Sequence, residues 1–259
     1  MTQLRLRACI LFALSSAVLP GQAAGQSAPP PTPVTAEFAT PTDRYPHNIM
    51  GRRKAHTDLI VDLAPCRDCG AQGETLAIRL PVSLVFEDFA PRLVDLNRDG
   101  RNEILVVESD QGKGARLALW EVTGDARAPR LVRGATTEFI GTRFRWLAPI
   151  GAADFDGDGA IELAYVETPH RDRILRIVRR EGATLRQIMA VAGVTNHAIG
   201  QEMVQSRVEN CADGPTIFAL NASGDRVLSV QIRDGAGVVM DRGPAERRDH
   251  LDDGPLCDR

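Results

Sequence analysis

Apolar residues occur along the chain in short runs, and no stretch keeps the helical period of about 3.6 residues over a useful length. The runs are rich in β-branched residues and are bounded by Gly, Asp, Pro and Asn, which is typical of strands and turns. The pattern therefore predicts an all-β fold. The predicted strands are residues 58–63, 75–80, 83–86, 103–108, 115–122, 162–167, 174–180, 184–191, 216–220, 226–232 and 237–240.

The strand pattern contains an internal repeat. The segment DLNRDGRNEILVV, which begins at Asp95, has a near copy in DFDGDGAIELAYV, which begins at Asp154, 59 residues later. A third, less complete copy surrounds Asp213, and residues 55–63 form a fourth trace that lacks the acidic loop. The repeat indicates that one structural unit recurs along the chain.

Each repeat unit contains about four strands in about 45 to 59 residues, which is the size of a propeller blade. A single four-stranded meander cannot bury both of its faces, so neighbouring units must cover it. We therefore predict a small β-propeller of four-stranded blades over residues 37–259. It would have four blades, or five if residues 37–56 add strands, and an open stack of sheets is the structural alternative.

The two complete acidic loops carry oxygen-bearing side chains at positions 1, 3, 5 and 9 and glycine at position 6. Alternate residues of a tight loop point to one centre, and the backbone carbonyl of position 7 can face it too. Such oxygen donors suit Ca²⁺, whereas carboxylates this close repel each other without a cation. The predicted ligands are Asp95, Asn97, Asp99, Arg101 (backbone) and Glu103, and Asp154, Asp156, Asp158, Ala160 (backbone) and Glu162.

The loops do not match an EF-hand, which needs a bidentate Glu at position 12 and an exiting helix. Position 12 is Val106 in the first loop and Tyr165 in the second, and both loops lead into predicted strands. Each loop is therefore expected at a hairpin tip. The alternative to a metal site is a solvated polar turn.

The segments that begin at Asp95 and Asp154 resemble the calcium hairpins of FG-GAP repeats, also called VCBS repeats. These repeats build the integrin α-subunit propeller and many secreted bacterial propellers. The resemblance is strong over the two loops and weak over residues 55–240. It implies a propeller with one structural calcium ion at each hairpin, two in all, held by the ligands named above. Position 9 is Glu here, where integrin repeats favour Asp.

The third copy departs further from the pattern. It offers Glu209, Cys211 and Asp213, but its position 9 is Ile217. Its ligand set is incomplete, so we do not expect it to bind metal as the first two loops do.

The N-terminus has the layout of a secretory signal peptide over residues 1–25. Arg5 and Arg7 precede an apolar run at 8–19, which ends in small residues. An uncleaved anchor is the alternative. Residues 26–36 are rich in proline and are predicted to be an extended linker. We expect a periplasmic or secreted protein with no membrane span after signal cleavage.

Export makes disulfides the expected state of the four remaining cysteines. Cys66 and Cys69 would close a short local loop, which leaves Cys211 with Cys257. Four cysteines allow three pairings, so this pairing is a preference.

Motifs for catalysis are absent from the sequence, which contains no GxSxG, HExxH or P-loop. His47 and His197 share a similar context and would lie close in a closed propeller, but we interpret both as structural. Arg143, Arg145 and Trp146 either line a binding face or simply pack the tryptophan.

The formal net charge of −3 does not indicate a nucleic-acid partner. The leading hypothesis is a monomeric, non-enzymatic calcium-binding module whose loops bind an unknown protein or glycan ligand. The alternative is a secreted metal-dependent hydrolase on a propeller scaffold, and a cell-envelope assembly factor is a third possibility.

Overall fold

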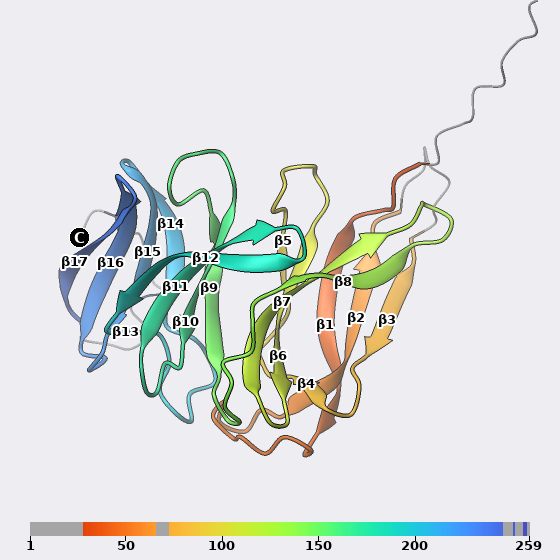
Figure 1. Ribbon diagram of the computed structural model, residues 1–259, viewed down its shortest axis with the longest axis horizontal. Helices are drawn as coiled ribbons and strands as arrows, with labels where there is room; N and C mark the ends of the chain where they lie inside the picture. Colours follow the sequence, from red (N-terminus) through yellow and green to blue (C-terminus); the bar gives the residue numbers. More distant parts are fainter. Residues whose placement is uncertain (1–27, 66–72, 246–250, 252–255, 258–259) are drawn as a thin grey trace, which may run out of the picture.

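The computed structural model describes residues 28–65, 73–245, 251 and 256–257. Every regular element in these ranges is a β-strand, which confirms the predicted all-β class (Figure 1). The predicted signal peptide and the proposed Cys66–Cys69 disulfide lie outside the described residues. In the described part, no helix is long and apolar enough to cross a membrane.

The strands form four consecutive units along the chain (Figure 1). The first unit contains β1 (Pro33–Thr42), β2 (Ala55–Leu63), β3 (Thr75–Arg79) and β4 (Leu84–Phe86). The second contains β5 (Arg92–Val94), β6 (Glu103–Asp110), β7 (Gly114–Thr123) and β8 (Arg130–Thr136). The third contains β9 (Leu147–Ala153), β10 (Glu162–Glu167), β11 (Ile174–Glu181) and β12 (Thr184–Ala192). The fourth contains β13 (Val194–Thr195), β14 (Arg207–Cys211), β15 (Gly214–Asn221), β16 (Arg226–Arg233) and β17 (Ala236–Pro244).

Hydrogen bonding joins the first three units into one twelve-stranded sheet, and the fourth unit is a separate five-stranded sheet. Strand β4 links the first two units because it pairs with both β2 and β6. The second and third units meet at one parallel pair, Thr136 with Thr184. Both sheets are open and strongly curled, and hydrogen bonding among the described strands does not join them into a ring.

Successive side chains of the central strands alternate between two buried faces, which explains why the sequences of these strands are almost continuously apolar. In β6, Ile104 and Val106 join the cluster shared with the first unit, while Leu105 and Val107 join the cluster shared with the third. Because successive side chains of a strand point to opposite faces, both faces of β6 are buried.

Strands β10 and β15 repeat this arrangement. Leu163 and Ala164 belong to different clusters, as do Ile217 and Phe218. Each unit is therefore covered by its neighbours, as expected for stacked repeats. In Figure 1 the units follow one another along the long axis, with β1–β3 near one end and β15–β17 at the other.

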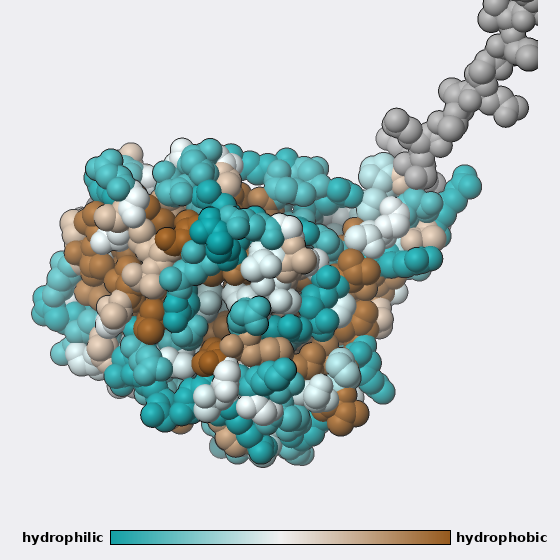
Figure 2. Space-filling view, in the orientation of Figure 1, coloured by the Kyte–Doolittle hydropathy of each residue, from teal (hydrophilic) through white to brown (hydrophobic). Residues whose placement is uncertain are grey.

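The stack has two edges that carry different loops. The β5–β6, β9–β10 and β14–β15 hairpins lie along the upper edge in Figure 1, whereas the loops that contain residues 168–173 and 196–205 lie along the lower edge. Figure 2 shows apolar surface gathered over the fourth unit, whose last strand exposes Val239 and Met240. The predicted acidic sites belong to the β5–β6 and β9–β10 hairpins, so both lie on the upper edge in Figure 1.

One boundary differs from the sequence prediction. Strand β1 begins at Pro33, inside the predicted 26–36 linker, and it pairs along β2 as far as Thr42. The strand within residues 37–56 therefore extends the first unit and does not start a fifth.

Candidate functional site

Backbone amides shape the β9–β10 hairpin by donating to its own carboxylates. The amide of Gly159 donates to Asp154 Oδ2 over 3.0 Å, and that of Ala160 donates to Asp158 Oδ1 over 2.9 Å. Gly159 has a φ of 96°, which a residue with a Cβ rarely adopts. The glycine at position 6 therefore permits the turn that the sequence predicted.

Three carboxylates of this hairpin converge. Asp154, Asp156 and Glu162 each offer an oxygen, and the three oxygens lie within 4.8 Å of one another. Asp154 Oδ1 is buried and has no hydrogen-bond partner among the described residues. A buried anionic oxygen without a partner is costly, so this atom fits a ligand of a hard cation such as Ca²⁺.

Glu162 anchors the hairpin to the sheet. Its side chain is fully buried, and its Oε2 accepts the Phe155 amide over 2.9 Å. Burial raises the pKa of this carboxyl, and the nearby Arg179 guanidinium opposes that rise. The positive charge of Arg179 therefore favours the ionised form of Glu162.

Arg179, from β11, supplies positive charge to the same hairpin. Its guanidinium lies 2.8 Å from Asp156 Oδ2 and 2.7 Å from Asp158 Oδ2, and its Nε donates to Glu162 Oε1 over 2.8 Å. These carboxylates raise the pKa of Arg179 above its usual range. Arg98, from the neighbouring hairpin, adds a longer contact of 3.6 Å to Asp154.

The β5–β6 hairpin has the same backbone arrangement. The Gly100 amide donates to Asp95 Oδ2 over 2.9 Å, and the Leu96 amide donates to Glu103 Oε2 over 2.9 Å. These bonds match those made by Gly159 and Phe155, so the two loops are structurally equivalent. Burial also raises the pKa of Glu103.

The first hairpin differs in how its side chains converge. The Arg101 guanidinium forms an ion pair of 2.6 Å with Asp99, which lies two residues earlier in the same loop. Among the described residues, only the second hairpin brings three carboxylate oxygens within 4.8 Å of one another. The side chain of Asn97, at position 3, donates to Asp99 over 3.1 Å. The backbone carbonyls of Arg101 and Ala160 stay predicted ligands.

The third copy, at the β14–β15 hairpin, has other uses for its polar groups. Cys211 forms a disulfide with Cys257, which confirms that half of the predicted pairing. Glu209 accepts the Leu256 amide over 3.0 Å and pairs with Arg207. Asp213 pairs with Arg233 on β16. The disulfide and Glu209 therefore fasten the C-terminal segment.

The lower edge carries aromatic and histidine side chains whose proximity the sequence did not predict. His170 Nε2 lies 2.8 Å from His197 Nδ1, and the Trp146 ring packs against both imidazoles. His47 instead pairs with the buried Glu87 over 2.7 Å. The hydrogen-bond partners of His47 and His197 are therefore Glu87 and His170, which the sequence did not predict.

The packing interpretation of Trp146 is confirmed, because its side chain is buried and its indole donates to the Glu87 carbonyl over 2.7 Å. No signal within any one segment pointed to His170 or Glu87. They lie 27 and 40 residues from their partners, so only the fold brings them together.

Comparison with known protein families matches residues 95–165 to the FG-GAP-like repeat. The match begins at the lead aspartate of the first hairpin and includes all of the second, so this segment is an FG-GAP-like repeat. Neither the curated proteins nor the solved structures gave a match to the chain.

Proposed function

We propose that the protein is an exported, calcium-stabilised repeat module that binds a partner through its loops and does not catalyse a reaction. The observation that carries the calcium proposal is the buried, unpaired Asp154 Oδ1 beside Asp156 and Glu162. The FG-GAP-like repeat over residues 95–165 supports it, since both acidic hairpins lie within the match.

The ion would be held by Asp154, Asp156, Asp158 and Glu162 with the Ala160 carbonyl, and at the first hairpin by Asp95, Asn97, Asp99 and Glu103 with the Arg101 carbonyl. It would supply the positive charge that these oxygens lack. Extracellular calcium modules bind with dissociation constants of about 0.1 to 1 mM, which suffices outside the cytosol. The role is structural, because each ion would fasten a hairpin tip between two strands.

Three further features support the rest of the proposal. The Cys211–Cys257 disulfide suits an oxidising compartment and hence export. The four-stranded units have blade-like connectivity, so we propose that they are propeller-type blades. The acidic hairpins and the loops at residues 168–173 and 196–205, which contain His170 and His197, lie on opposite edges, which favours a binding module over a metal-dependent hydrolase.

The test compares Asp154→Asn with a matched control, Asp213→Asn, which alters the aspartate of the third copy. At a calcium concentration of ten times Kd, one site adds about 1.4 kcal/mol. That raises the melting temperature of a domain this size by about 3 to 6 °C. We expect calcium to stabilise the wild type and Asp213→Asn, and to stabilise Asp154→Asn less.

Calorimetry gives the decisive result. If the chelator-stripped protein takes up no Ca²⁺ at millimolar concentrations, the hairpins are polar turns and the proposal is wrong. Metal-dependent turnover of ester or phosphoester substrates, without a change in melting temperature, would favour the hydrolase.

A further inference from the structure

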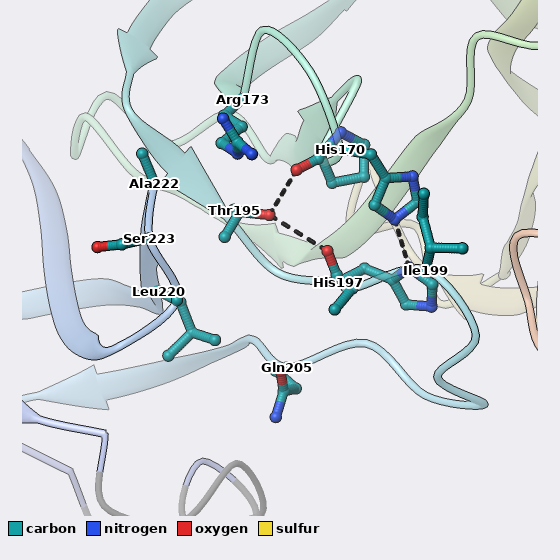
Figure 3. Close-up of a pocket in the computed structure, with 12 residues that line it drawn as sticks. His170, Arg173, Thr195, His197, Ile199, Gln205, Leu220, Ala222 and Ser223 are labelled. Carbon is teal, nitrogen blue, oxygen red and sulfur yellow. Dashed lines mark hydrogen bonds between the residues drawn. The ribbon is translucent and has the colours of Figure 1, made fainter.

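A second candidate site lies on the opposite edge from the acidic hairpins, where the third and fourth units meet. A pocket of about 280 Å³ opens between the loop at residues 168–173, the loop that follows β13, and the β15–β16 turn (Figure 3). Its volume is near the lower limit for small-molecule sites, which also occur preferentially at interfaces between structural units.

The walls of the pocket are mainly apolar. Leu220 and Ala222 lie on one side in Figure 3, and Ile199 lies on the other together with the two imidazoles. Ile199 is 70% exposed, so it forms part of the rim. An apolar body of modest size would gain contact area with these side chains on entering.

Arg173 gives the pocket a positive end. In Figure 3 it lies at the end opposite Gln205. Its guanidinium makes one hydrogen bond, a long one of 3.3 Å to the Arg171 carbonyl, and no ion pair with any described carboxylate. The three arginines that follow on β11 differ, because Arg176, Arg179 and Arg180 each pair with an acid.

No described residue that lines the pocket is acidic. The positive charge of Arg173 is therefore not balanced within the pocket. A guanidinium recognises a carboxylate through two parallel hydrogen bonds, which gives it a natural partner of the missing sign.

The backbone holds Arg173 in a defined place. The loop starts at Thr168 with φ 46° and ends at Arg173 with φ 55°. Positive φ is unusual for any residue with a side chain and most so for a β-branched one. The amides of Arg171 and Arg173 both donate to the Thr168 carbonyl, over 2.8 and 3.1 Å, so the loop is closed on itself.

The histidine pair adds no charge at neutral pH. His197 Nε2 lies 3.0 Å from the Gln201 carbonyl, so it must carry a proton, and Nδ1 then accepts from His170 Nε2–H. Burial, with the nearby His197, His47 and Arg173, lowers the pKa of His170 to about 4. The pocket thus presents a single full charge.

We propose that this pocket binds a small organic monocarboxylate whose apolar body lies between Leu220 and Ile199 while its carboxylate pairs with Arg173. The site is separate from the calcium hairpins and does not depend on them. One positive charge selects a monoanion, and the apolar walls select a compact hydrocarbon or aromatic body.

The test uses benzoate as the anionic probe and benzamide as its neutral isostere, in calorimetric titrations of the full chain. We expect saturable benzoate binding and at least about tenfold weaker binding of benzamide. Arg173→Gln should lose about tenfold in benzoate affinity, and Arg173→Lys should retain part of it. Arg186→Gln, which alters an exposed arginine on β12, is the matched control and should bind normally.

Equal affinity of the wild type for the two probes would overturn the proposal without any variant. So would unchanged benzoate affinity in Arg173→Gln. Calcium titrations, and benzoate titrations in EGTA, separate the two proposals. If the protein binds no calcium but still prefers benzoate to benzamide, only the proposal of calcium hairpins is rejected.

Discussion

The guanidinium of Arg179 contacts three carboxylates of the second hairpin, where a bound cation would also interact. The hairpin contains four acidic side chains, Asp154, Asp156, Asp158 and Glu162, so Arg179 neutralises only part of their charge. An arginine and a calcium ion would therefore compete for the same oxygens.

Replacing Arg179 with Met should raise the calcium affinity of this hairpin on the order of tenfold, because no internal cation has to be displaced. The calcium-free variant should be less stable than the wild type, because its carboxylates then repel each other. Calorimetric titration measures the first effect, and urea unfolding in EGTA measures the second.

Arg176→Met is the matched control. Arg176 lies on the same strand and pairs with Glu167, away from the hairpin tip. Its loss should change stability alone and leave calcium affinity unchanged. Weaker calcium binding in Arg179→Met would mean that the arginine organises the site and does not compete for it.

His170 should make folding stability depend on pH. Its folded pKa is lowered to about 4, mainly by burial, from an ordinary value of 6.5. Between these values the unfolded chain binds more protons than the folded chain, so stability falls as the pH falls from 6.5 toward 4. Above pH 6.5 this contribution is fully present.

The measurement is the urea midpoint of the wild type and of His170→Gln at pH 7.5 and pH 5. The glutamine amide can still donate to His197 Nδ1, but it does not titrate. The advantage of the wild type over the variant should shrink at the lower pH. Buried acids such as Glu87, whose pKa is raised, have the opposite pH dependence, but they are common to both proteins. An unchanged difference at the two pH values would refute the prediction.

At the level of elements, the central strands with two buried faces were predictable, whereas several shorter or less buried strands were not. The predicted runs at 103–108 and 162–167 coincide with β6 and β10, because burial on both faces leaves a continuous apolar run. The strands without a predicted counterpart are β1, β5, β8, β9, β13 and β14. Two of them, β1 and β9, share a reason. Each contains proline, which usually argues against a strand, and each lies at an edge of the twelve-stranded sheet, where proline is tolerated.

The β6–β7 hairpin rests against the loop that carries Trp146, and Gly114 makes the close approach possible. A Cβ atom at Gly114 would overlap the Thr142 carbonyl oxygen, and the φ angle of Gly114 is 76°. Gly114→Ala should therefore cost about 1 to 3 kcal/mol more than Gly182→Ala. Gly182 also has positive φ but has open space around its Cβ position.

Chemical denaturation of the two variants isolates the clash, because backbone strain is common to both. Equal losses of stability would mean that the 140–146 loop shifts freely and does not fix the hairpin.

For the whole molecule, the acidic hairpins could be predicted and the pocket could not. Each hairpin is built from nine consecutive residues, so spacing alone reveals its donors. The pocket combines Arg173, His197 and Leu220, which are brought together only by the stacking of two units. The sequence predicted repeated units, which the structure contains, and it favoured a β-propeller over an open stack without a residue that would decide between them.

The Cys211–Cys257 disulfide should stabilise the whole fold. It joins cysteines 46 residues apart, and closing a loop of this length in the unfolded chain contributes about 4 kcal/mol in the chain-entropy treatment. The double variant Cys211→Ser/Cys257→Ser should therefore show a lower urea midpoint than the wild type. An unchanged midpoint would show that the C-terminal segment stays in place without the covalent bond.

This bond also bears on which surface of the fourth unit is accessible. Leu251 and Leu256 pack with Phe218 and Val227 on the outer face of the fourth unit, away from the third. A further repeat could dock on that face only after this segment had been displaced. Leu251 and Leu256 therefore shield this face, and a duplicated repeat placed here would have to replace their contacts with its own.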